Sequence, residues 1–240
     1  MVRLPDNTLL FGSNLDFDFS KQLSVLAYKQ RVMRSGKLLY YANGIYGISG
    51  VLRGVVPGKF YVSINERNGK GDSFRNLFFT QGNEALYHLR YILENATDYK
   101  SALDLARNHS LLARAYYSIM GTTGNEGCVI ERTENGIHNE YCLSDEVWFL
   151  VQTNTDRDLP DPDNDCRRDP AENYLNTTVG RQNMTRENLK FLLTHAPNHV
   201  GAHDPFDPEG TITTILGQHN QGDDKLFDVQ VWDWDDFIKR

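Results

Sequence analysis

The chain has 240 residues, of which 40% are hydrophobic and 24% are charged, and these values are typical of a folded domain. They exclude disorder along most of the chain, and this length allows roughly 70% of the unfolded surface to be buried. There are 25 basic residues against 32 acidic residues, for a net charge of -7, and no basic cluster could follow a phosphate backbone, so we do not expect a nucleic-acid partner.

The compartment is left open by the composition. No stretch approaches the roughly 20 apolar residues that span a bilayer, so no transmembrane segment is expected. Residues 1–20 have no basic start and no apolar run, unlike a signal peptide, which favours a cytoplasmic protein. Four N-x-S/T sequons favour the secretory route instead: Asn95, Asn108, Asn176 and Asn183. The three cysteines Cys128, Cys142 and Cys166 allow at most one disulfide.

The N-terminal third is predicted to form strands. Residues 8–11 form a short apolar segment. In residues 23–33 apolar and polar side chains alternate, and several are β-branched or aromatic. A turn-like segment at 34–37 leads to apolar residues 38–41, which predicts a hairpin. A further strand is predicted at 59–64, with a polar segment after it.

In the middle of the chain, the spacing of the apolar residues changes from that of a strand to that of a helix. Residues 86–93 and 102–106 have helical spacing, the second after a cap at Thr97 or Asp98. Strands are then predicted at 116–120, 128–131 and 147–152, followed by a helix that runs from a Thr185 cap to Pro197. Closing strands are predicted at 211–216 and 226–232. Strands alternating with blocks of helices, joined by hairpins, favour a layered α+β fold over a doubly wound parallel sheet.

Two patterns could in principle hold a metal ion. The acidic loop that begins at Asp161 matches several EF-hand positions, but Cys166 stands where that loop needs glycine. The histidines His195, His199 and His203 are spaced by four, but Pro197 and Gly201 would interrupt the helix. A nucleophile elbow and a dinucleotide fingerprint are also missing. We therefore expect neither a metal nor a cofactor.

Polar residues follow three of the apolar segments. Asp16, Glu66 and Asn154 each come shortly after such a segment, and polar groups at strand ends often line a cleft. Arg167 follows the acidic loop, and an arginine near Asp16 or Glu66 would hold that carboxylate ionised. On composition alone, turn residues and surface ion pairs are the more common explanation.

The order of five short segments resembles a known family. These are GSNLDF (12–17), NER (65–67), EGCVI (126–130), VQTN (151–154) and DCRR (165–168). Together they resemble the β-subunit of the acid ceramidase and N-acylethanolamine-hydrolysing acid amidase family, which belongs to the N-terminal nucleophile hydrolases of the choloylglycine hydrolase type. The likeness extends from about Thr8 to about Asn176, and the segments at 93–97 and 126–128 favour the ceramidase branch.

The resemblance implies a four-layer αββα sandwich formed by residues 1–240 as one catalytic domain. It implies lysosomal or secreted localisation and hydrolysis of the amide of N-acylsphingosine to fatty acid and sphingosine. The partners it implies are a lipid amide substrate and an α-subunit or pro-segment from the same precursor. A cysteine at the start of the β-subunit is the nucleophile in such enzymes, and its own α-amine is the base.

Carried over by position, five residues receive roles. Asp16 would orient the amine and thiol, Asn154 would help stabilise the oxyanion, and Arg167 would support the site electrostatically. Glu66, with its neighbour Asn65, would face the substrate head group.

Two departures lead us to expect an inactive or truncated chain. The family's cysteine would fall about four residues ahead of Met1. In addition, Ser13 replaces an arginine of the family, which removes a cation that would lower the pKa of the thiol. The alternatives are a non-catalytic lipid-binding paralogue, an N-acylethanolamine amidase, or a cytoplasmic protein with another role.

Overall fold

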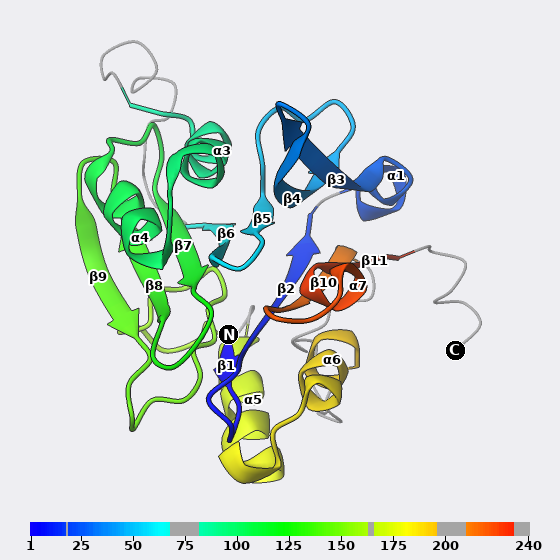
Figure 1. Cartoon of the computed structure of the whole chain (residues 1–240). Helices are drawn as coiled ribbons and strands as arrows, with labels where there is room; N and C mark the ends of the chain where they lie inside the picture. Colours follow the sequence, from blue (N-terminus) through cyan, green and yellow to red (C-terminus); the bar gives the residue numbers. More distant parts are fainter. Residues whose placement is uncertain (18, 68–81, 163–165, 196–209, 233–240) are drawn as a thin grey trace.

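The strands form two antiparallel sheets in a computed structural model that describes residues 1–17, 19–67, 82–162, 166–195 and 210–232 (Figure 1). The smaller sheet has the order β1 (Val2–Arg3), β2 (Leu9–Asp16), β10 (Thr211–Gln218) and β11 (Asp228–Val231). It joins the first strands to the last ones, because β2 pairs with β10 from Leu10 opposite Gln218 to Asp16 opposite Thr211.

The larger sheet is a meander in which each strand is antiparallel to the next. Its strands are β3 (Ala27–Arg34), β4 (Lys37–Ile45), β5 (Arg53–Val56), β6 (Phe60–Glu66), β7 (Ala115–Met120), β8 (Gly127–Arg132) and β9 (Ile137–Cys142). The predicted hairpin is confirmed between β3 and β4, where Ser35 and Gly36 have positive φ angles of 50° and 77°. Such a turn matches the right-handed twist of paired strands.

Helices cover the outer face of each sheet. An apolar cluster joins α3 (Ala85–Asn95) and α4 (Tyr99–Asn108) to the larger sheet. Another joins α5 (Arg168–Asn173), the π-helical η1 (Tyr174–Val179) and α6 (Arg186–Thr194) to the smaller sheet. The remaining helical segments are α1 (Ser20–Ser24), the short η2 (Arg181–Asn183) and α7 (Asp223–Leu226).

The two sheets pack against each other through a separate apolar layer. Phe11 of β2 stacks on Tyr61 of β6 at 5.2 Å between ring centroids, and Val55, Val129 and Ile215 complete the contact. The order of layers is therefore helix, sheet, sheet, helix, and the expected four-layer αββα sandwich of the α+β class is confirmed.

Two of the predicted strands differ from the structure. The strand expected from residue 23 starts at Ala27, because Leu23 belongs to α1 and packs on Leu15, while Val25 is 80% exposed. The strand expected at 147–152 is wrong: this segment makes one isolated bridge, between Phe149 and Val2. Its apolar side chains instead pack between the layers. The neighbouring strand β1 is only two residues long, so it cannot form a longer series of backbone hydrogen bonds with this segment.

The predicted helix caps have a direct structural basis. Asp98 accepts a hydrogen bond from the Ser101 amide at 2.7 Å and begins α4 in a capping box. Thr185 begins α6 in the same way, with Asn188 as its partner. Side-chain oxygens at these positions satisfy amides that lack a partner within the helix. Within the described ranges, no helix is long and apolar enough to cross a membrane.

Cys128 and Cys142 face each other on β8 and β9 and form a disulfide. Cys166 is the remaining cysteine and is not part of this disulfide. The link closes a loop between residues separated by 14 positions. A crosslink of this kind stabilises the fold mainly by restricting the unfolded chain.

We expect C142A to lower the free energy of unfolding by about 2–3 kcal/mol, the amount typical of a loop of this length. Urea titrations with and without dithiothreitol measure the effect. The reductant should destabilise the native protein by a similar amount and should leave C142A unchanged. The control C166A should behave like the native protein, and a native protein insensitive to reductant would contradict the prediction.

Two buried histidines are held in the neutral form. Burial, with the neighbouring His109 and Arg132, lowers the pKa of His88 to about 4, and burial lowers the pKa of His219 to about 4. His88 contacts the Tyr117 hydroxyl at 2.9 Å, but neither ring nitrogen of His219 has a hydrogen-bond partner in the described chain. Because both pKa values lie below the unfolded value of about 6.5, the fold loses stability as the pH falls from 6.5 towards 4.

H219F should therefore reduce the acid sensitivity of the fold. One such histidine costs about 2 kcal/mol of stability at pH 5 relative to pH 8, because protons bind the unfolded chain preferentially. Phenylalanine does not titrate and can retain the ring contact with Tyr61. Urea unfolding at both pH values measures the difference, with the exposed His195→Gln as control. An unchanged acid loss in H219F would contradict this account.

Candidate active site

A cavity of about 500 Å³ opens where the start of β1 meets the ends of β2 and β6. Its walls are largely apolar, with Leu52 and Leu86 at one side and Leu189, Leu192 and Leu193 of α6 at another. The polar side chains that line it include Asp16, Arg53, Asn65, Glu66, Asn154 and Arg167. A cavity with apolar walls and a few polar groups is typical of a small-molecule site.

Arg167 joins the two predicted catalytic residues that lie far from each other in the sequence. Its Nη1 donates to Asp16 Oδ2 at 2.8 Å, and its Nη2 donates to Asn154 Oδ1 at 2.8 Å. The side chains of Asp16 and Arg167 are each 20% exposed. A charge-assisted pair at this depth is shorter and stronger than a neutral hydrogen bond. The structure therefore brings Asp16, Asn154 and Arg167 together.

The second oxygen of Asp16 and the amide of Asn154 are also held. Thr211 Oγ1 of β10 donates to Asp16 Oδ1 at 2.7 Å. Asn154 Nδ2 donates to the Glu66 carbonyl at 2.9 Å, and the primary amide has a second N–H that this bond does not use. Asn154 is thus oriented from both ends of its amide, as a preorganised hydrogen-bond donor requires.

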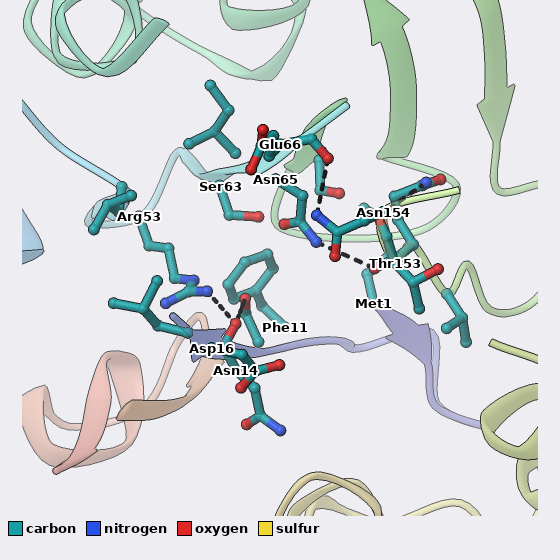
Figure 2. Close-up of a pocket in the computed structure, with 18 of the residues that line it drawn as sticks. Met1, Phe11, Asn14, Asp16, Arg53, Ser63, Asn65, Glu66, Thr153 and Asn154 are labelled. Atoms are coloured by element: carbon teal, nitrogen blue, oxygen red, sulfur yellow. Dashed lines mark hydrogen bonds between the residues drawn. The ribbon is translucent and has the colours of Figure 1, made fainter. Parts of the chain in front are cut away.

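The predicted head-group residues, Asn65 and Glu66, end strand β6 on the pocket wall. Asn65 Nδ2 lies 3.5 Å from the Gln152 carbonyl, and the Glu66 side chain is exposed. Figure 2 shows both beside Asn154 and across the pocket from Asp16. All five residues selected from the sequence therefore lie in one pocket, while the roles assigned to them stay predictions.

Arg53 is a pocket residue that the sequence analysis missed. It is 3% exposed, and Figure 2 shows its guanidinium extending towards Asn14 and Asp16. Its Nη2 donates to the Asn14 carbonyl, which Ser13 Oγ also approaches at 3.5 Å. A cation therefore lies beside Ser13, although Ser13 itself carries none. The sequence signal was an arginine inside the apolar run of residues 51–56.

Met1 forms part of the pocket wall at the start of β1. Its backbone nitrogen donates to the Leu150 carbonyl at 2.9 Å, and its carbonyl accepts from the Leu150 amide at 2.9 Å. Figure 2 shows Met1 between Phe11 and Thr153. The start of β1 is thus held at the same pocket as Asp16 and Asn154.

The described part of the acidic loop places an arginine beside its cluster of possible metal ligands. Asp161, Cys166 and Asp169 approach one another, but Arg168 Nε lies 3.7 Å from Asp161 Oδ1 and occupies that side of the cluster. Asp161 Oδ2 accepts from the Asp169 amide at 2.8 Å. Residues 163–165, like His199 and His203, lie outside the described residues.

The comparisons with known proteins all find amide hydrolases. The family model described as linear amide C–N hydrolases, choloylglycine hydrolase family, matches residues 2–142. N-acylethanolamine-hydrolyzing acid amidase of Oryctolagus cuniculus is 32% identical over 191 residues, covering 78% of this chain and 53% of the relative. Acid ceramidase of Heterocephalus glaber is 32% identical over 200 residues, covering 79% and 49%. This chain thus spans about half the length of these relatives.

Two solved structures share the fold. The Caenorhabditis elegans N-acylethanolamine-hydrolyzing acid amidase ortholog superposes with a TM-score of 0.81 at 25% identity, covering 96% of this chain and 97% of that chain. Penicillin V acylase from Agrobacterium tumefaciens has a TM-score of 0.55 at 12% identity, covering 96% and 81%, which is a likeness of fold alone.

We expect Asp16 and Arg167 to be strongly coupled in a double-mutant cycle. D16N and R167M each break a largely buried pair and leave one partner uncompensated, so the coupling should be about 1–3 kcal/mol. Urea unfolding of the native protein, both single variants and the double variant measures it. The exposed pair Lys100–Asp104, treated in the same way, is the control and should show no measurable coupling. Additive effects of D16N and R167M would contradict the prediction.

Proposed function

Since the chain belongs to the linear amide C–N hydrolases of the choloylglycine hydrolase family, we propose that it is the β-subunit-like part of a hydrolase that cleaves fatty acyl amides. The observation that carries the proposal is the convergence of Asp16, Asn154 and Arg167 in an apolar-walled pocket at the start of β1. A hydrophilic substrate would leave the leucine-rich walls of this pocket without a partner.

The chemistry follows from the positions of the three side chains. The nucleophile is a cysteine joined ahead of β1, where the backbone enters the pocket, and its freed α-amine takes the thiol proton. Asp16, which is paired with Arg167, orients that amine. Asn154 directs its remaining amide N–H to the oxyanion that forms when the thiolate attacks the acyl carbonyl. The C–N bond then breaks, the α-amine passes the thiol proton to the leaving amine, and the acyl group stays on the cysteine as a thioester. Water hydrolyses the thioester, which releases the acid and restores the thiol.

The substrate class is an N-acyl amide with a long apolar acyl chain. Relatives named acid ceramidase and N-acylethanolamine-hydrolyzing acid amidase support this class with similar identity, and we propose a ceramide as the first candidate. The acyl chain lies against Leu189, Leu192 and Leu193, and the amine portion faces Asn65 and Glu66. An α-subunit or pro-segment from the same precursor is the proposed partner.

A non-catalytic lipid-binding protein is the second candidate. The observation that favours it is that no cysteine is among the described residues that line the pocket. Cys128 and Cys142 are joined in the disulfide, and Cys166 belongs to the acidic loop. Such a protein would bind the acyl amide in the same pocket and release it unchanged.

We further propose a lysosomal or secreted location. A disulfide persists in an oxidising compartment and is rare in the cytosol, so the Cys128–Cys142 link supports this location. The asparagines of all four sequons are exposed: Asn95, Asn108, Asn176 and Asn183. Exposure is what a glycan at these positions requires.

The proposed hydrolysis is tested with a short cysteine-led segment placed ahead of Met1, its length varied residue by residue. On a fluorogenic fatty acyl amide at acidic pH, we expect turnover from the cysteine-led protein and none above a blank from the 240-residue chain. Asn154→Ala in the cysteine-led protein should lower kcat by roughly 10²–10³, the usual loss of one oxyanion donor.

The matched control carries serine in place of the leading cysteine, and it should be inactive although its fold and ligand affinity are unchanged. Binding of the amide without turnover at every segment length would favour the lipid-binding candidate. Turnover by the 240-residue chain itself, abolished by Asn154→Ala, would contradict the proposed nucleophile.

A further inference from the structure

Arg53 differs from the other arginines of the pocket in forming no ion pair with a carboxylate of the described residues. Arg167 is paired with Asp16 at 2.8 Å, and Arg114 lies 3.4 Å from Glu134. In the described part of the chain, no carboxylate lies within 4 Å of the Arg53 guanidinium, and its Nε and Nη1 have no hydrogen-bond partner. Two of the three nitrogens of this buried guanidinium are thus without a hydrogen-bond acceptor among the described residues.

This arrangement is costly unless something else satisfies it. Removing an ionised side chain from water lowers the stability of the fold when no partner compensates, and each unmet donor lowers it further. Burial lowers the pKa of Arg53 to about 10, while Asp16 acts in the opposite direction. The side chain therefore remains a cation at neutral and acidic pH. Unsatisfied buried donors in a native structure call for an explanation, and a bound anion supplies one.

The position of Arg53 restricts the kind of anion. Its Nη2 is fixed on the Asn14 carbonyl, and Figure 2 shows the guanidinium on the same side of the pocket as Asp16, away from Glu66 and Asn154. The pocket that contains Arg53 also has apolar walls, which include Leu52, Leu189, Leu192 and Leu193. A compact inorganic anion would leave those walls uncovered.

We propose that Arg53 is the anion-binding residue of this pocket and takes the carboxylate of a long-chain fatty acid, with the alkyl chain against the leucines of α6. A guanidinium presents its N–H groups in a plane that matches the two oxygens of a carboxylate. The inference rests on the proposed function in one respect: hydrolysis of an acyl amide by water gives an amine and this acid. Arg53 is thus a binding residue for the released acid.

The test uses binding, so it does not depend on turnover. Equilibrium dialysis of radiolabelled laurate and of radiolabelled dodecanol, which share one chain length, compares a charged with an uncharged head group on the full chain at neutral pH. We expect laurate to bind at least about tenfold more tightly than dodecanol. R53M should remove this preference by weakening laurate about tenfold or more, while dodecanol changes by less than about threefold.

R53M should fold, because a buried unpaired charge is replaced by an apolar side chain of similar length. R53Q is the second variant: it keeps hydrogen-bond donors without the charge and should also lose the preference. The matched control is R114M, which removes a pocket arginine already paired with Glu134 and should bind both ligands as the native protein does.

Laurate affinity that is unchanged in R53M and R53Q would overturn the proposal and would leave the proposed hydrolysis standing, provided that the cysteine-led protein turns over its amide. Absence of binding by both laurate and dodecanol would overturn the inference and also the acyl pocket of the proposed function. An equal loss of laurate in R114M would show a general charge effect and would likewise overturn the role of Arg53.

Discussion

The burial of strand β2 on both faces is the constraint on which the rest of the molecule depends. Leu9 and Phe11 point into the layer between the sheets, and Leu10, between them, points to the helices of the smaller sheet. Because side chains alternate along a strand, a shift of one residue would exchange the two faces. The register of β2 against β10 therefore places Asp16 at the pocket and Thr211 beside it.

The pocket combines the Asp16–Arg167 ion pair with the guanidinium of Arg53 at the meeting point of several segments. Arg167 comes from the residue before α5, Asn154 from an irregular segment and Arg53 from strand β5. The pair of Arg167 and Asp16 is neutral as a whole, so the charge of Arg53 is the part that the protein leaves without an acidic partner among its described residues. The pocket is therefore chemically asymmetric: it has the Arg53 guanidinium near Asn14 and the acidic residue Glu66 near Asn154.

The disulfide and the two buried histidines are not among the residues that line this pocket. The disulfide joins β8 to β9, which is an edge strand of the larger sheet. His88 belongs to α3, and its ring contacts the hydroxyl of Tyr117 on β7. His219 follows β10 and contacts Tyr61, which belongs to the layer between the sheets. Each of these histidines binds a proton more readily in the unfolded chain than in the fold. Acid therefore lowers the free energy of unfolding through residues that pack between the layers.

The sequence by itself determined the local elements and the list of polar candidates. Alternation and helical spacing predicted the β3–β4 hairpin and the helices α3, α4 and α6, and short capping patterns placed the start of α4 and α6, because these signals depend on neighbours in the chain. The order of short segments identified the family and selected Asp16, Asn65, Glu66, Asn154 and Arg167.

Only the tertiary structure decided which of these groups meet and which strands form. Residues 147–152 have a strand-like composition but lack a partner strand long enough to pair with, and pairing is a long-range property. In the sequence, Arg53 is only an arginine within an apolar run. The packing of β5 against β2 shows that it donates to the Asn14 carbonyl and forms no ion pair among the described residues. The contact of Asp16 with Arg167 spans 151 residues, a separation over which no local pattern specifies distance.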